Sequence, residues 1–119
     1  MKKVVLSMFL LSGILFAQNA QDIIADNGCM SCHNIMDLKS APAFAGIARK
    51  NKRFYSQNAK SNIMNSIKNG SQGKYRRFAG TKMPAFSHLN DTELNILADY
   101  ILSLKANKNC KQHGGNRPY

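Results

Sequence analysis

Cys29 and Cys32 are separated by two residues and are followed at once by His33. Two thiols one helical turn apart can each add across one of the two vinyl groups of a porphyrin. The adjoining imidazole can then lie beneath the iron as its fifth ligand. The spacing Cys-x-x-Cys-His is therefore the attachment signature of a c-type haem. A chain with this signature is expected to fold around one flat, apolar group.

Two other kinds of site use closely spaced cysteines. A Cys29–Cys32 disulfide in a thioredoxin-like fold requires β-α-β patterning around the motif, and the sequence shows little strand character. A zinc site requires a further ligand at suitable spacing, and His88 is the only candidate outside the C-terminal tail. A haem site is the favoured interpretation, with a zinc or thiol-redox module as an alternative.

The N-terminus has the layout of a secretory signal peptide. Lys2 and Lys3 precede a mostly apolar run at residues 4–16, and the small residues Ala17 and Ala20 follow it. The run is shorter than the roughly 20 apolar residues that a membrane-spanning helix needs. We expect cleavage after Ala17, with Ala20 as the alternative site, and export to the periplasm. An uncleaved N-terminal anchor is the other interpretation.

Residues 18–105 are then expected to form one small domain, and residues 106–119 a basic, flexible tail that contains Cys110. The formal net charge of the chain is +11, and it becomes +9 without Lys2 and Lys3. Such a charge suits nucleic acid, an anionic membrane or an acidic protein. An exported chain rarely meets nucleic acid, and the sequence has no nucleic-acid-binding motif and no second segment of membrane-spanning length. We therefore expect an acidic protein partner.

Apolar spacing predicts four short helices and no convincing strand. The helices are expected at residues 22–28, 43–53, 59–68 and 91–105. Residues 54–58 are expected to be irregular, residues 70–90 are expected to form a long loop, and Asn90 with Glu93 is close to a capping box. The fold class is therefore all-α. The apolar side chains of such short helices need a common surface, so folding is expected to depend on the haem.

The second axial ligand decides between electron transfer and chemistry at an open iron site. Met83 lies in the long loop, 50 residues after His33, and Pro84 restricts the backbone beside it. The other methionines lie in the signal peptide, in or beside the attachment motif, or on an apolar helix stripe, as Met64 does. Met83 is the preferred candidate, and His88 is the alternative.

Several stretches together are more specific than the five-residue motif alone. They are Gly28-Cys29-Met30-Ser31-Cys32-His33, Ala41-Pro42-Ala43-Phe44, Asn69-Gly70-Ser71-Gln72-Gly73, Lys82-Met83-Pro84 and Leu97-Ala98-Asp99-Tyr100-Ile101-Leu102. In this order and spacing, across about residues 20–105, the chain resembles the small monohaem class I cytochromes c that act as bacterial periplasmic electron carriers. The resemblance implies a cytochrome c fold, with about four short helices wrapped around one covalently attached haem c.

The resemblance also implies a role for each matching residue. Cys29 and Cys32 would form the two thioether bonds to the haem. His33 and Met83 would be the axial ligands of its iron. The first and last helices would cross and pack together.

Two further residues match positions that surround the haem in this family. Pro42 matches the position whose carbonyl accepts the ring N–H of the ligand histidine, a bond that fixes the tautomer and makes the imidazole more basic. Tyr75 falls where an aromatic residue often hydrogen-bonds a haem propionate. Two positions depart from the pattern: Ala41 stands where relatives commonly have glycine, and Phe86 where some relatives use a polar residue to hydrogen-bond the methionine sulfur.

The implied function is one-electron transfer between Fe(II) and Fe(III) by a monomeric carrier that is not an enzyme. The implied partners are a quinol:cytochrome c oxidoreductase upstream, and a terminal oxidase, peroxidase or nitrite reductase downstream. No stable membrane insertion is expected after signal cleavage. Two basic clusters could guide docking: Arg49, Lys50, Lys52 and Arg53, and Lys74, Arg76, Arg77 and Lys82. The alternative is a haem-based sensor or haem enzyme subunit in which Met83 is a labile ligand.

Overall fold

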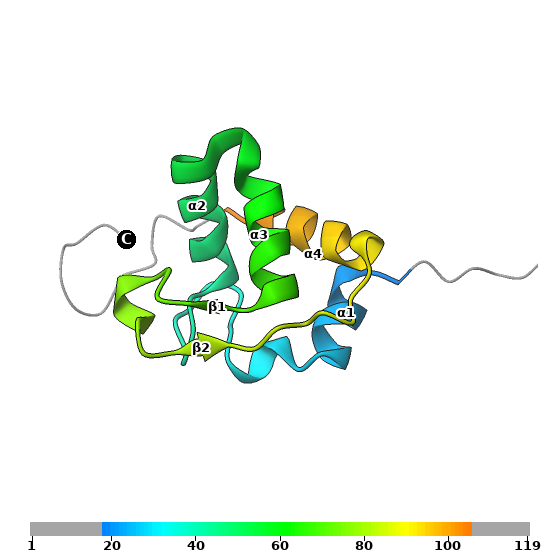
Figure 1. Ribbon diagram of the computed structural model, residues 1–119, viewed down its shortest axis with the longest axis horizontal. Coiled ribbons are helices and arrows are strands. Elements are labelled where there is room, and N and C mark those ends of the chain that lie inside the picture. Colours follow the sequence, from blue (N-terminus) through cyan, green and yellow to red (C-terminus); the bar gives the residue numbers. More distant parts are fainter. Residues whose placement is uncertain (1–17, 106–119) are drawn as a thin grey trace, which may run out of the picture.

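Four α-helices make up most of the regular structure in the computed structural model, which describes residues 18–105 (Figure 1). They are α1 (Ala20–Asp26), α2 (Phe44–Tyr55), α3 (Ala59–Asn69) and α4 (Asp91–Ser103). Single turns of 3-10 helix occur at Cys29–Ser31, Ser56–Asn58 and Arg76–Phe78. The all-α prediction is confirmed. The predicted signal peptide and basic tail, with Cys110, lie outside the described residues.

One short pair of strands departs from the prediction. Within the long loop, β1 (Ser71–Gln72) pairs antiparallel with β2 (Lys82–Met83), and Ser71 lies opposite Met83. The prediction of no strands was wrong here because two residues are too few to show the alternating pattern that marks a strand in a sequence. The pair joins the two ends of the loop formed by residues 73–81 and positions Met83.

The helix ends follow local capping. The side chain of Asn19 accepts a hydrogen bond from the Asp22 N–H at 3.0 Å, so α1 begins two residues before the predicted start. The predicted capping box is present at α4, where Asn90 and Glu93 exchange two hydrogen bonds of 2.9 Å. The expected irregular segment at residues 54–58 is instead the last turn of α2 followed by a 3-10 turn.

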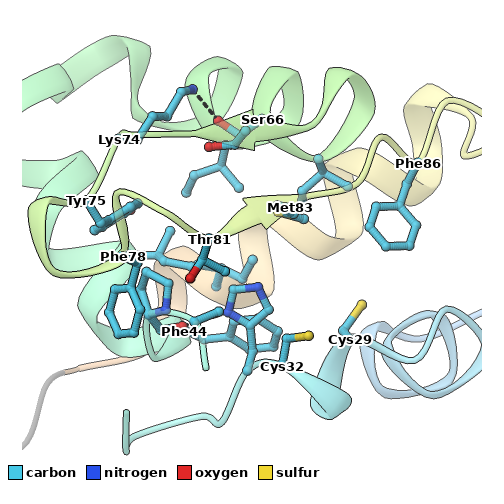
Figure 2. A pocket seen from close by; sticks show the side chains of 18 of the residues that line it. Cys29, Cys32, Phe44, Ser66, Lys74, Tyr75, Phe78, Thr81, Met83 and Phe86 are labelled. Carbon is cyan, nitrogen blue, oxygen red and sulfur yellow. Dashed lines mark hydrogen bonds between the residues drawn. The ribbon is translucent and has the colours of Figure 1, made fainter. Parts of the chain in front are cut away.

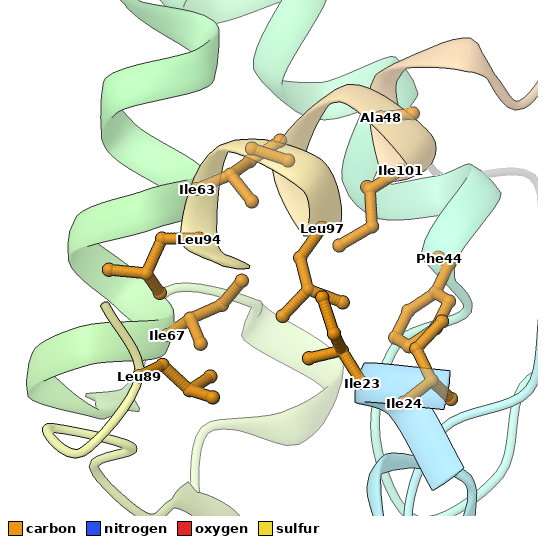
Figure 3. Packing of buried hydrophobic residues seen from close by; sticks show 11 residues of the cluster. Ile23, Ile24, Phe44, Ala48, Ile63, Ile67, Leu89, Leu94, Leu97 and Ile101 are labelled. Carbon is orange, nitrogen blue, oxygen red and sulfur yellow. The ribbon is translucent and has the colours of Figure 1, made fainter. Parts of the chain in front are cut away.

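α4 is the central element of the hydrophobic core, because it contacts α1, α2 and α3 (Figure 3). The core cluster consists of Ile23, Ile24, Phe44, Ala48, Ile63, Ile67, Leu89, Leu94, Leu97, Ala98 and Ile101. α1 is too short to be stable alone. It is held against α4 by Ile23 and Ile24, both of which are buried. The first and last helices therefore pack together, as the resemblance implies.

α2 and α3 contact each other and α4, and the remaining face of this group is covered by the Cys29–Pro42 segment and the β1–β2 loop. No helix within residues 18–105 is long and apolar enough to cross a membrane.

Candidate haem site

A cavity of about 370 Å³ lies between the attachment motif and the β1–β2 loop (Figure 2). Its volume is within the range of roughly 300–1,000 Å³ that is usual for cofactor and ligand sites. Apolar side chains from three helices line it: Phe44 and Ile47 from α2, Ile63 and Ile67 from α3, and Leu97 and Ile101 from α4. The cavity and the hydrophobic core thus share side chains.

Cys29 and Cys32 lie on one tight turn at the edge of this cavity. Gly28 has a φ of +63°, a left-handed conformation that lets the chain pass from α1 directly into the 3-10 turn. The N–H groups of Cys32 and His33 donate to the Cys29 carbonyl at 3.3 and 3.0 Å. Both cysteines are free thiols that line the cavity. Burial raises the pKa of the Cys29 thiol, and a backbone hydrogen bond opposes this effect.

His33 is held in one orientation by the backbone. It is only 7% exposed, and its Nδ1 lies 2.6 Å from the Pro42 carbonyl oxygen. Because a carbonyl can only accept, Nδ1 is the donor, and in the neutral ring Nε2 then keeps its lone pair. Burial lowers the pKa of His33, and the bond to Pro42 opposes that effect. The structure therefore provides a neutral imidazole with a free ring nitrogen at the cavity.

Pro42 reaches this position because the loop before it folds back on the motif. The N–H of Ala41 donates to the Cys32 carbonyl at 3.0 Å, and the N–H of Phe44 donates to the Asn34 carbonyl at 3.0 Å. Ala41 is buried, so alanine fits at the position where relatives commonly have glycine.

Met83 lines the same cavity on the wall opposite the cysteines (Figure 2). Its strand passes very close to Gly70, which has a φ of +78°, and a Cβ on Gly70 would lie 2.8 Å from the Met83 carbonyl oxygen. On the other side of Met83, the Phe86 N–H donates to the Ile67 carbonyl at 2.9 Å. Phe86 is half-buried at the cavity, so an apolar ring stands where some relatives have a polar residue.

Tyr75 lies at the end of the cavity away from Cys29 (Figure 2). Lys50 Nζ lies 4.1 Å from the centre of its ring. Burial raises the pKa of the Tyr75 hydroxyl above its ordinary value, repulsion from Tyr55 adds to this, and a hydrogen bond with Asn51 opposes it. Tyr75 is thus a neutral phenol at the polar end of an otherwise apolar cavity.

Asn51, which is buried, and Asn62 form an amide pair beside Tyr75 that the sequence analysis missed. Asn51 is 3% exposed; its Nδ2 donates to the Ile47 carbonyl at 2.9 Å, and its Oδ1 accepts from Asn62 Nδ2 at 2.6 Å. The pair joins α2 to α3 and supports Tyr75. The sequence did indicate that Asn51 would face inward, because it lies three residues after Ala48 and four before Tyr55 and so falls on the same face of the helix.

His88, the alternative ligand, does not line the cavity. It is exposed, and its Nε2 lies 2.7 Å from Asn27 Oδ1. Within residues 18–105 no three His, Cys, Asp or Glu side chains come together as a metal site. α1 precedes the cysteines and a 3-10 turn contains Cys29, where a thioredoxin-like site would have a β-α-β unit.

The groups around the cavity fit a covalently attached haem. The cysteine wall presents two thiols and a buried imidazole with a free ring nitrogen, and the facing wall presents a thioether. Apolar side chains line the middle, and amide, phenol and ammonium groups gather at one end, which suits a macrocycle with an apolar body and two carboxylates.

Comparison with known proteins agrees with this chemistry. A family model described as Cytochrome c matches residues 17–105. The chain is 33% identical to cytochrome c-552 of Hydrogenobacter thermophilus over 97 residues, which cover 80% of this chain and 89% of that protein. It is 32% identical to cytochrome c-552 of Nitrosomonas europaea over 108 residues, which cover 88% of this chain and 100% of that protein.

The crystal structure of wild-type Nitrosomonas europaea cytochrome c552 is also similar. It aligns with a TM-score of 0.63 at 30% identity and covers 71% of this chain and 99% of that one. The chain therefore belongs to the cytochrome c family. Within that family it falls among the small class I monohaem cytochromes, which are electron carriers with a covalently attached haem c.

Proposed function

We propose that this chain is a periplasmic one-electron carrier in which His33 and Met83 are the axial ligands of the haem iron. Cys29 and Cys32 form the thioether bonds. The observation that supports this most strongly is that Met83, which follows His33 by 50 residues, lines the opposite wall of the same cavity.

The haem supplies the one-electron Fe(III)/Fe(II) couple. His33 donates its Nδ1–H to the Pro42 carbonyl, which fixes the tautomer and makes the coordinating nitrogen more electron-rich. Met83 supplies a thioether, which favours the ferrous state relative to a second histidine and so raises the reduction potential. Phe44, Ile63, Leu97 and the other apolar side chains keep water from the ligands and lower the polarity of the site.

The proposed location and partners rest on the sequence. Residues 1–17 have the layout of a signal peptide, and the basic clusters suit acidic redox proteins. The candidate partners are a quinol:cytochrome c oxidoreductase as donor and a terminal oxidase, peroxidase or nitrite reductase as acceptor. Because charge attraction speeds encounter, we expect electron exchange with such a partner to slow as salt rises. A rate independent of ionic strength would contradict this docking mode.

The competing function is a haem sensor or haem enzyme subunit in which Met83 leaves the iron. Met83 is half-buried on a two-residue strand, so its hold on the iron decides between the two functions. The test is the optical spectrum of the holoprotein with and without carbon monoxide. We expect the oxidised protein to show the methionine–iron absorption band and the reduced protein to resist carbon monoxide. Rapid carbon monoxide binding and no such band would contradict the carrier function.

The Met83→Ala variant gives a second measurement. Because axial ligands move haem potentials over roughly 0.8 V, we expect a fall in reduction potential on the order of 0.1 V or more. Met64→Ala is the matched control, since Met64 is half-buried on α3 and does not line the cavity, and its potential should stay close to that of the wild type.

A further inference from the structure

His88 lies in the segment that connects Met83 to α4, and its side chain reaches the other wall of the cavity. Its Nε2 lies 2.7 Å from Asn27 Oδ1, across a sequence separation of 61 residues. Asn27 directly follows α1, precedes Cys29 by two residues and lines the cavity. The bond therefore joins the methionine segment, defined as residues 83–89, to the residues that lead into the cysteine wall.

The other hydrogen bonds of Asn27 determine which atom donates to which. Asn27 Nδ2 donates to the Ile23 carbonyl at 2.8 Å, and the backbone N–H of Asn27 donates to the same carbonyl at 3.2 Å. Since a carbonyl can only accept, the amide nitrogen faces Ile23 and the amide oxygen faces His88. The amide oxygen is also an acceptor, so His88 Nε2 carries the hydrogen. Because Ile23 belongs to the buried core, the acceptor for His88 is fixed to the core through α1.

The Phe86 ring connects His88 to the cavity. The centroids of the two rings are 6.1 Å apart and the rings are tilted by 57°, within the range of interacting aromatic pairs. Phe86 lines the cavity and lies on the same side of it as Cys29 (Figure 2). A movement of His88 away from α1 would therefore also remove a contact of the Phe86 ring.

The methionine segment is held on its α3 side by different contacts. Met83 pairs with Ser71, which follows α3, and the Phe86 N–H donates to the Ile67 carbonyl at 2.9 Å. The segment is thus attached to α3 on one side and, through His88, to α1 on the other. Loss of one attachment would let the segment move without unfolding the helices, because local opening costs less than global unfolding.

We propose that His88 is a positioning residue for Met83, whose bond to Asn27 holds the methionine segment against α1 and so keeps the thioether on the iron. This inference rests on the proposed carrier function, in which Met83 is an axial ligand. Met83 leaves the iron when its segment moves away from the cavity, and the bond adds to the free energy of that movement. His88 thus favours the closed site of an electron carrier over the open site of a sensor or enzyme.

The test measures how fast Met83 leaves the iron in the reduced holoprotein. Carbon monoxide binds only after the methionine has left, so at saturating gas its binding rate in stopped flow equals the rate of methionine release. We expect His88→Ala to raise this rate about two- to fivefold, the factor expected for one exposed hydrogen bond. Asn27→Ala/His88→Ala should be no faster than Asn27→Ala alone, because both changes remove the same bond. Independent, multiplicative effects of the two changes would overturn the proposal.

Two variants separate positioning from general stability. Asp99→Ala removes another exposed, long-range bond, in which Lys60 Nζ lies 3.0 Å from Asp99 Oδ2 between α3 and α4. We expect it to lower the free energy of unfolding, as His88→Ala does, but to leave the carbon monoxide rate unchanged. His88→Gln retains an N–H donor on its side chain and should bring the rate back toward that of the wild type. A wild-type rate in His88→Ala, or an equal rise in Asp99→Ala, would overturn the proposal.

Amide hydrogen exchange gives a readout that does not depend on the ligands of the iron. In His88→Ala the Phe86 N–H should exchange faster, whereas the Ile47 N–H, which donates to the Ala43 carbonyl at the start of α2, should be unaffected. Failure of the carrier function would look different. A wild-type protein that binds carbon monoxide at once would overturn ligation by Met83, whereas slow binding that His88→Ala does not accelerate would overturn only this inference.

Discussion

The two walls of the haem cavity are built in different ways. The cysteine wall is local, because Cys29, Cys32, His33 and Pro42 all lie within residues 29–42 and are joined by short-range hydrogen bonds. The methionine wall depends on tertiary contacts. Met83 lies on a two-residue strand that pairs with Ser71 and lies against Gly70, and neither of these neighbours is close to it in sequence.

This difference separates recognition of a cofactor from control of its chemistry. In the proposed arrangement the cysteine wall attaches the haem and supplies one ligand, and a short motif encodes it. The methionine wall would supply the second ligand, and its geometry depends on how α3 ends and how the β1–β2 loop returns. Substitutions in the two walls should therefore have different consequences.

The largest effect is expected when the cysteine wall loses its covalent bonds, in Cys29→Ala/Cys32→Ala. Without its covalent bonds the haem no longer reliably fills the cavity of about 370 Å³, and the apolar side chains that line it lose a large part of their packing partners. We expect this variant to lose cooperative thermal unfolding in circular dichroism. Ser31→Ala, in the same turn, is the control: it loses only an exposed hydrogen bond to the Gly28 carbonyl, so it should still unfold cooperatively. A cooperative transition near the wild-type temperature in the double variant would show that the core does not need the haem.

The next effect is expected in the methionine wall, at Gly70. A Cβ there meets the Met83 carbonyl at 2.8 Å, and the φ of +78° disfavours any side chain, so Gly70→Ala should lower the free energy of unfolding by about 2–3 kcal/mol. It should also weaken the methionine–iron absorption band of the oxidised protein. Gly46→Ala is the control: Gly46 is in α2 with nothing within 4 Å of its added Cβ, and it should gain about 0.5–1 kcal/mol. Equal effects at the two glycines would show that the close approach of Gly70 to Met83 does not stabilise the methionine wall.

A smaller effect is expected at the amide pair beside Tyr75, which joins α2 to α3. Asn51→Leu removes the acceptor of Asn62 and the partner of Tyr75, so we expect a loss of about 1–3 kcal/mol in urea unfolding of the holoprotein. Asn65→Leu, at an exposed position of α3, should stay within about 0.5 kcal/mol. A neutral result at Asn51 would show that the pair is not needed to join α2 to α3.

The smallest effect is a pH dependence from Tyr75. Its pKa is raised in the folded protein, so the folded state binds this proton more tightly than the unfolded state does. The resulting stability is complete below the ordinary tyrosine pKa of about 10 and is lost as pH rises above it, by up to about 1.4 kcal/mol per pH unit. The free energy of unfolding of the wild type should therefore fall more steeply with alkaline pH than that of Tyr75→Phe. Parallel profiles for the two proteins would contradict the burial of this hydroxyl.

The same contrast explains what the sequence could predict. The haem motif, the four helices, the capping box at Asn90 and the candidate ligand Met83 follow from local spacing and residue type. The β1–β2 pair and the Asn51–Asn62 bond do not, because each depends on residues brought together by the packing of α3. The contact of Lys50 with Lys74, which joins α2 to the segment before the Arg76–Phe78 turn, could not be predicted for the same reason.

The most direct test of the two-wall arrangement is the proton NMR spectrum of the reduced holoprotein. The methyl group of a methionine bound to haem iron lies in the ring current of the porphyrin, so its resonance is shifted far upfield. We expect one such resonance in the wild type, its loss in Met83→Leu and its persistence in Met64→Leu. An upfield methyl resonance that survives in Met83→Leu, or that disappears in Met64→Leu, would contradict the assignment of Met83 as the ligand opposite His33.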